Sequence, residues 1–121
     1  MDETRYGLDM ASWIAAKDEA RTILIGYAKQ KDTITYSELA QEIHSFHFEP
    51  HDFRLFGLIG EISTEESDAG RGMLSAVVVL KDEGMPGPGF FVLAKKLGFD
   101  TRDQVAFWTK ELKRVYAAWN K

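Results

Sequence analysis

The histidines of this sequence gather between residues 44 and 52, where they alternate with carboxylates. All three histidines of the chain lie here, and imidazole and carboxylate groups are ordinary ligands of zinc and related divalent cations. The spacing differs from the H-E-x-x-H arrangement, which places two histidines on one face of a helix. A solvated polar loop anchored by Phe46 and Phe48 is therefore the favoured interpretation. No metal site is predicted among these five residues: His44, His47, Glu49, His51 and Asp52.

A second group that could do chemistry surrounds residues 61–81. Arg71 has a planar guanidinium that can bind a carboxylate or an amide-bearing ligand, and Glu61 and Ser75 lie near it in the sequence. An ion pair between Glu61 and Arg71 would also arise as simple structure, and no spacing here matches a catalytic motif. A ligand site at Glu61, Arg71 and Ser75 is thus a hypothesis, whereas no catalytic residue or cofactor is predicted.

Residues 84–89 read Gly-Met-Pro-Gly-Pro-Gly and follow an apolar run. The glycines permit backbone conformations that other residues avoid, while the prolines stiffen the segment and remove two backbone donors. The phosphate-binding signature G-x-x-x-x-G-K-[ST] is absent. We interpret this segment as a rigid turn, which could also present Met85 to a partner.

The charges of the chain divide unevenly between its two parts. Residues 1–70 contain 14 acidic and 6 basic residues, a balance of −8, and residues 71–121 contain 5 acidic and 9 basic residues, a balance of +4. Lys110, Lys113 and Arg114 are spaced for one face of a helix, which could contact phosphates or an acidic protein surface. Together with Arg71 and Met85, they are the predicted partner-binding residues.

Length and composition favour one domain over residues 1–121, with a flexible N-terminal segment at 1–9. The chain has 45% hydrophobic and 28% charged residues, enough for a true core. The absence of cysteine excludes disulfides and thiol nucleophiles. The acidic start differs from a signal peptide, and no apolar run approaches the roughly 20 residues that span a bilayer. We expect a cytoplasmic protein without membrane contact.

Local patterns predict the first elements that would position these residues. Apolar residues at helical spacing, beginning with Trp13, predict a helix over 10–31. A short extended segment at 33–35 should lead into a helix ending near His44, with Thr35 and Glu38 as a capping box. A third helix is expected to begin at Pro50. Its apolar face should contain Phe53, Leu55, Phe56, Leu58, Ile59 and Ile62.

The second part of the chain should contain a strand and two helices. The nearly unbroken apolar run 73–80 predicts a strand covered on both faces. Residues 90–97 fit a helix that ends at Gly98, with a second strand as the alternative. A long amphipathic C-terminal helix should start after a capping box of Thr101 and Gln104. Its apolar stripe is Val105, Trp108, Leu112, Val115 and Trp119.

The order of helix, short strand, capped helix, helix, strand and loop resembles a winged-helix domain. The residues that carry the resemblance are TITYSELA at 33–40 and VVVLKDEGMPGPGF at 77–90. Within that class the pattern is similar to alkyltransferase-like DNA-repair proteins, over roughly residues 13–91, and the chain as a whole resembles small bacterial proteins. The resemblance implies a Pro-Cys-His-Arg site where this chain reads Gly-Met-Leu-Ser-Ala at 72–76, so alkyl transfer to cysteine is excluded.

The predicted fold is α+β, a winged-helix-like single domain that is mostly helical with a small sheet. Three functions remain open. The first is a non-enzymatic protein-interaction or regulatory module that binds another protein or itself. The second is a nucleic-acid-binding winged helix that uses the loop and the basic last helix, because the third helix region contains one arginine against five carboxylates at 52–68. The third is an enzyme of unknown reaction around Glu61, Arg71 and Ser75.

Overall fold

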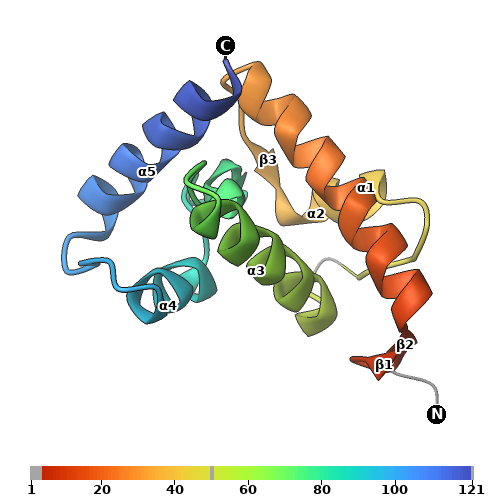
Figure 1. The fold of residues 1–121 in the computed structure, drawn as a ribbon. Helices are drawn as coiled ribbons and strands as arrows, with labels where there is room; N and C mark the ends of the chain where they lie inside the picture. The colour runs from red at the N-terminus through yellow and green to blue at the C-terminus, as the bar shows by residue number, and fades with distance from the viewer. Residues whose placement is uncertain (1–3, 50, 121) are drawn as a thin grey trace.

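Five α-helices contain most of residues 4–49 and 51–120, which are the residues that the computed structural model describes (Figure 1). Two short parallel strands and a hairpin accompany them, so the fold is α+β and mostly helical. The helices are α1 (Met10–Lys29), α2 (Tyr36–Glu42), α3 (Phe53–Asp68), α4 (Pro88–Lys96) and α5 (Gln104–Trp119). The strands are β1 (Thr4–Arg5), β2 (Leu8–Asp9), β3 (Ile34–Thr35) and β4 (Val78–Val79), and a 3₁₀ helix, η1, spans Leu74–Val77.

The core lies where α1, α3 and α5 enclose η1. Each of the three helices contacts η1, and α1 and α5 converge at the end of the molecule where the chain terminates (Figure 1). The buried stripe of α1 begins at Trp13 and recurs every three or four residues to Ala28. Asn120 fastens the end of α5 to α1, since its Nδ2 donates to the Ala28 carbonyl at 2.8 Å.

The predicted capping box before α2 is confirmed. The Thr35 hydroxyl accepts from the Glu38 amide, and the Glu38 carboxylate accepts from the Thr35 amide at 3.0 Å. β3 ends at this box and pairs in parallel with β4, in the register Ile34↔Val78 and Thr35↔Val79. The box therefore fixes the direction in which α2 leaves the sheet.

Two other predicted helix starts differ from the structure. α3 begins at Phe53 because the Asp52 side chain accepts from the Arg54 amide, and Pro50 lies outside the described residues. The capping box of Thr101 and Gln104 is wrong. Asp103 caps α5 instead, by accepting from the Ala106 amide at 3.0 Å.

The predicted strand over 73–80 is also wrong except at Val78–Val79, because Leu74–Val77 form η1. The backbone of this segment bonds to side chains of the enclosing helices rather than to a neighbouring strand. The Met73 amide donates to the buried Glu111 carboxylate at 2.7 Å, and the Ser75 amide donates to the Ser63 hydroxyl at 2.8 Å. Each residue from 73 to 77 is buried. The segment is therefore as apolar as a strand that is covered on both faces, although it is not a strand.

The N-terminal segment contains a hairpin. Within the expected flexible segment 1–9, the structure describes 4–9, in which β1 pairs antiparallel with β2. Tyr6 and Gly7 form the two-residue turn with positive φ angles of 54° and 85°, as a tight hairpin of this twist requires. Leu8 is buried in the core, and Tyr6 is directed toward α3.

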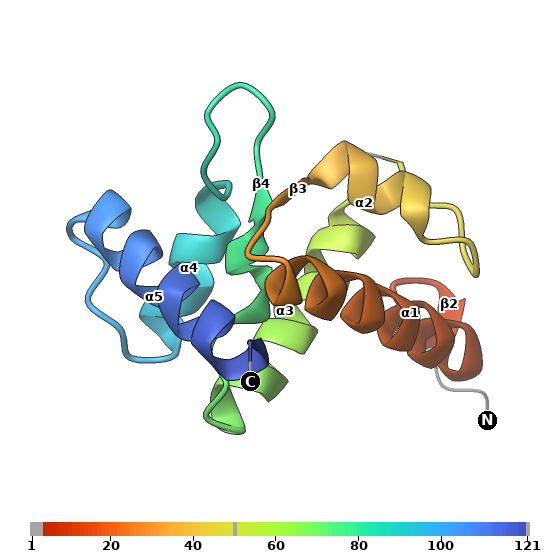
Figure 2. The same cartoon turned by 90° about the horizontal axis from the view of Figure 1, so that it is seen from above.

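The loop between β4 and α4 stands out from the body of the molecule (Figure 2). It closes on itself through hydrogen bonds from the Leu80 amide to the Met85 carbonyl and from the Gly84 amide to the Leu80 carbonyl. The expected helix over 90–97 is confirmed as α4, which Gly98 ends at a φ of +95°. No helix of the described residues is long and apolar enough to cross a membrane.

Candidate functional site

The third helix places two of its aromatic residues in solvent. Phe53 is 65% exposed and Phe56 is 43% exposed, whereas Leu55 and Leu58 are fully buried. The apolar face predicted for this helix is therefore buried only in part, and both phenylalanines lie on its exposed edge. The inward face of α3 is centred on its leucines and isoleucines, and it turns the phenylalanines toward the hairpin and α4.

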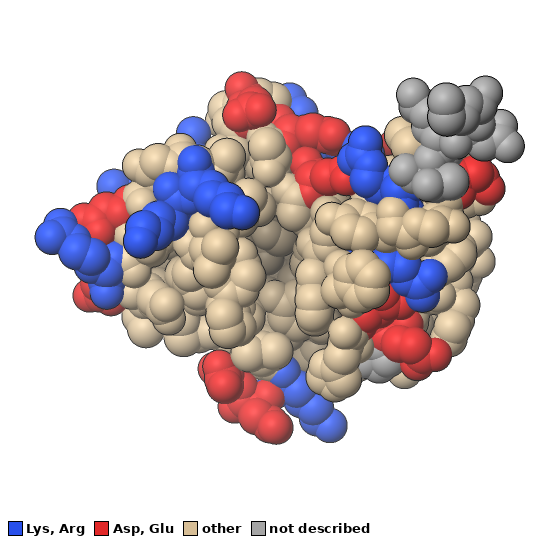
Figure 3. Space-filling view, turned by 90° about the horizontal axis from the view of Figure 1, so that it is seen from below, with Lys and Arg blue, Asp and Glu red and all other residues tan. Residues whose placement is uncertain are grey.

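A groove of about 430 Å³ lies beside these phenylalanines, between α3 and α4. We call it the apolar groove. Figure 3 shows a hollow at the centre of the face in view, with largely uncharged surface around it and charged side chains toward the rim. Gly57 and Gly60 of α3 provide part of the lining without side chains, while Val92 and Leu93 of α4 line it opposite. A hollow of this size matches the range of pockets that hold ligands or a few side chains.

Aromatic rings line the apolar groove or lie beside it. The Tyr6 ring lies 5.6 Å from that of Phe53, and the Tyr36 ring lies 5.4 Å from that of Phe56. Val92 adds a side chain that is 56% exposed. Six large hydrophobic residues are exposed in the described chain, and four of them lie in the apolar groove or next to it: Tyr6, Phe53, Phe56 and Val92. Such clustering marks interaction sites, whereas single exposed apolar residues are ordinary.

Two hydroxyl groups line the same groove. The Tyr36 Oη accepts from the Gly87 amide at 3.1 Å, and the buried Ser75 Oγ accepts from the Ser63 hydroxyl. Burial raises the pKa of Tyr36, although the hydrogen bond from Gly87 opposes the rise. The phenol therefore stays protonated at neutral pH and can donate to a ligand.

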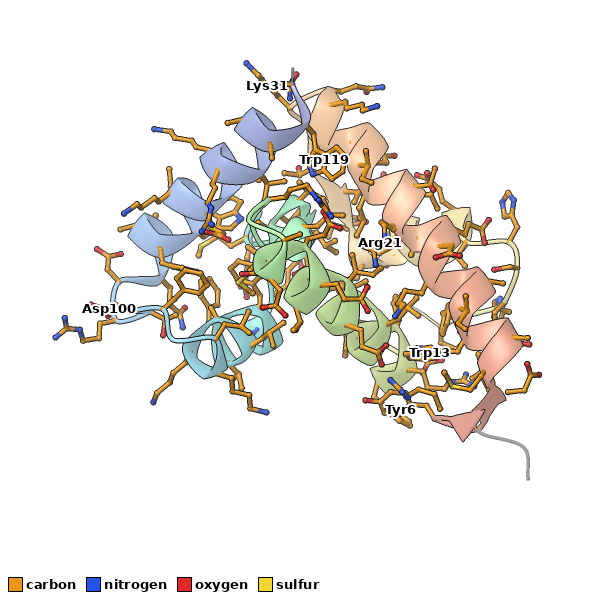
Figure 4. All side chains as sticks on the ribbon, in the orientation of Figure 1. Tyr6, Trp13, Arg21, Lys31, Asp100 and Trp119 are labelled. Carbon is orange, nitrogen blue, oxygen red and sulfur yellow. The ribbon has the colours of Figure 1, made fainter. Side chains whose placement is uncertain are left out.

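Glu61 is occupied by three donors from the first part of the chain. Its carboxylate accepts from Arg5 at 2.5 Å, from the Trp13 indole at 3.0 Å and from Lys17 at 3.3 Å. Burial raises the pKa of Glu61, but the hydrogen bonds from Trp13, Arg5 and Lys17 outweigh it and hold the pKa below the ordinary value. Figure 4 shows Trp13 between α1 and α3, where this contact forms. Glu61 is therefore an ionised structural anchor.

Arg71 has a different partner. It donates through Nε to the buried Glu66 carboxylate at 2.6 Å, and Arg21 binds the same carboxylate from α1. Its guanidinium also lies 5.6 Å from the centroid of the Trp119 ring. In Figure 4, Trp119 lies near the convergence of α1 and α5, and Arg21 lies farther along α1, on its side toward α3. In the described residues, no hydrogen bond or ion pair joins any two of Glu61, Arg71 and Ser75, and Ser75 alone lines the apolar groove.

The histidine segment also forms simple local contacts. Its three histidines are exposed, and the Nε2 of His47 lies 3.0 Å from the Glu49 carboxylate. The Glu19 side chain of α1 accepts from the His44 and Ser45 amides, and these hydrogen bonds hold the segment against α1. Within residues 4–49 and 51–120, no three metal-binding side chains gather into a possible cation site.

The basic residues of α5 border a second hollow, of about 820 Å³. Lys110, Lys113 and Arg114 line it with Arg102, but three carboxylates line it too. One of them, Asp100, accepts from the Arg102 guanidinium, and this hydrogen bond lowers the pKa of Asp100 to about 2. The carboxylates nearly balance the basic charge, so this hollow is a mixed-charge surface.

Met85 is half-buried and packs against the core, so the loop does not hold it out to solvent. Of the residues that line the apolar groove, only Ser75 is predicted from the sequence as a ligand-binding residue. Phe56 and Ile59 are predicted only as members of a helix face, and Gly87, Pro88 and Gly89 only as turn residues. Comparisons of the chain with known protein families, curated proteins and solved structures find no match.

Proposed function

We propose that this protein is a small interaction module whose apolar groove binds a hydrophobic segment of a partner protein. The observation that carries the proposal is the clustering of exposed aromatic and aliphatic side chains around one hollow. Water in contact with such surface is unfavourable, and burying an aromatic side chain in an interface contributes strongly to affinity.

The framework around the groove suits recognition without rearrangement. Helices α3 and α4 supply its two sides, and the Tyr36 hydroxyl joins α2 to the start of α4 through Gly87. Rigid sides lower the conformational entropy lost on binding. We further propose that the order α1, β3, α2, α3, β4 and loop is a winged-helix-like arrangement, used here for protein contact.

The proposal is tested by comparing copurification with two variants. Phe53→Ser combined with Phe56→Ser removes the exposed ring that lines the groove at Phe56 and the one beside it at Phe53, while Val105→Ser removes a comparably exposed apolar side chain from α5. Tagged proteins are isolated from the native lysate, and recovered proteins are quantified by mass spectrometry. A partner that is kept by wild type and Val105→Ser, is lost from the double variant, and rebinds in purified form supports the proposal. Equal recovery of every protein by all three contradicts it.

Nucleic-acid binding is a second candidate, favoured by the convergence of Lys110, Lys113, Arg114 and Arg102 on one hollow. It predicts binding of duplex DNA that weakens steeply with salt, because phosphate contacts release counterions. Lys110→Glu combined with Lys113→Glu should then abolish binding in fluorescence anisotropy, while the groove variants retain it. Salt-insensitive or undetectable binding of the wild type removes this candidate.

A further inference from the structure

Some polar groups that line the apolar groove have hydrogen-bond donors without an acceptor in the described part of the chain. The Tyr36 hydroxyl accepts from the Gly87 amide, and its own hydrogen has no acceptor among the described residues, while the Ser63 and Ser75 hydroxyls bond to each other. Lys96 lines the groove, and its ammonium forms no ion pair with the described residues. No carboxylate or carboxamide side chain lines this hollow. Its lining therefore offers donors and positive charge to an occupant.

The backbone adds to this character. α4 begins at the groove, where Gly87 is its N-cap and provides no side-chain acceptor for the first-turn amides. Pro88 has no amide N–H and the Phe90 amide donates to the Gly87 carbonyl, so Gly89 supplies the free amide of the first turn. The aligned peptide dipoles of α4 also favour a negative group near this amide. The hydroxyl of Tyr36 supplies an independent donor in the same hollow.

We infer that the groove selects an acidic hydrophobic peptide, in which large apolar side chains lie next to a carboxylate. This inference rests on the proposed function and specifies its partner. The apolar side chains would cover Phe56, Val92 and Leu93, while the carboxylate would accept hydrogen bonds from the donors or pair with Lys96. A basic peptide would instead leave these donors unpaired and repel the lysine.

The test uses a library of random 12-residue peptides displayed on phage, selected against three forms of the intact protein. Wild type is compared with Lys96→Glu, which reverses the groove's charge, and with Gly60→Leu, which places a side chain in the hollow. An added Cβ at Gly60 has its nearest neighbour at 3.9 Å, so it fits without a clash. Circular dichroism and thermal unfolding verify that each variant is folded.

The expected result is enrichment by wild type of peptides that combine large apolar residues with Asp or Glu, and loss of these peptides with Gly60→Leu. Lys96→Glu should select Lys or Arg in place of the acidic residue. In a synthetic peptide, replacing the carboxylate by the amide should weaken Kd about fivefold, as for one partly exposed charge contact.

Two other outcomes are decisive in different ways. If peptides depend on an open groove but show no acidic preference, or if Lys96→Glu leaves their selection unchanged, the inferred chemistry is wrong while the interaction site stands. If no peptide distinguishes wild type from Gly60→Leu, both the inference and the proposed groove fail.

Discussion

The Tyr6 ring lies directly on Gly57, so closely that a Cβ atom added to this glycine would come within 2.8 Å of the ring. The contact brings the N-terminal hairpin onto the middle of α3 and makes Tyr6 one edge of the apolar groove. Only a residue without a side chain at position 57 allows this approach. A residue near the start of the chain thereby completes a site formed mainly by the helices α3 and α4.

Gly57→Ala should move the Tyr6 ring while leaving the fold intact. The tyrosine is half-exposed and can swing away, and alanine favours a helix over glycine, so stability should change by no more than about 1 kcal/mol. Near-UV circular dichroism should change, because Tyr6 also packs 5.2 Å from the Trp13 ring. Gly60→Ala is the control, and an equal spectral change in both variants would contradict the account.

Gly72 has a structural role that substitution should expose. Its φ is +89°, and an added Cβ would lie 3.0 Å from the Val115 Cγ2, at the place where α5 packs over the start of η1. Gly72→Ala should therefore destabilise by about 2–4 kcal/mol, through backbone strain and overpacking together. Gly70 has a φ of +81° with nothing within 4 Å, so Gly70→Ala should cost only about 1–2 kcal/mol. Urea unfolding distinguishes them, and equal losses would show that packing against Val115 is unimportant.

The glutamates of α3 should make stability depend on acid pH. The hydrogen bond from Arg71 lowers the pKa of Glu66, and the hydrogen bond from Lys17 lowers that of Glu65, in each case below the ordinary 4.5. Because these pKa values are lower in the folded state, their stabilisation is present above about pH 4.5 and is lost as the pH falls through the folded values.

Glu66→Gln should thus reduce stability at pH 7 by about 2 kcal/mol and flatten its decline below pH 4.5. Urea unfolding between pH 3 and pH 7 measures both effects. Glu83→Gln is the control, because Glu83 is exposed in the loop and forms no ion pair with the described residues. A pH profile unchanged by Glu66→Gln would show that the network of Arg21, Glu66 and Arg71 does not stabilise the fold.

Trp108 should stabilise the protein through both its ring and its indole nitrogen. It packs against the core, and its Nε1 donates to the Ala76 carbonyl at 2.8 Å. Trp108→Ala should cost about 3 kcal/mol, whereas Trp108→Phe keeps an aromatic ring and should cost about 1 kcal/mol for the lost hydrogen bond. Chemical denaturation measures these losses. A near-neutral Trp108→Ala would mean that this side of α5 serves a partner rather than the core.

Local chemistry explains which parts of the fold could be predicted from the sequence. The capping box of Thr35 and Glu38 depends on residues three positions apart, and the buried stripe of α1 follows from helical periodicity alone. The segment 73–77 was mistaken for a strand because its backbone partners, the side chains of Ser63 and Glu111, come from distant helices. Long-range acceptors of this kind leave no signal in the segment itself.

The same distinction applies to the candidate site. Helical spacing identifies Phe53 and Phe56 as members of an apolar face, but their exposure depends on how far that face extends beyond the contact with α1 and η1. The groove also needs Tyr6 from the hairpin and Lys96 from α4, which are far apart in the sequence. The sequence does indicate that α3 has more apolar residues than one buried helix face requires. This excess predicts that some of them are exposed.

Site-specific photocrosslinking can show whether a partner binds at the apolar groove or elsewhere on the protein. A photoreactive phenylalanine analogue is placed in cells at Val92, which lines the groove, or at Val105, which lines none of the hollows described above. The two positions are 56% and 57% exposed, so accessibility does not distinguish them. The account predicts a discrete crosslinked partner from position 92 alone, whereas equal crosslinking from both positions, or a partner captured only from position 105, would contradict it.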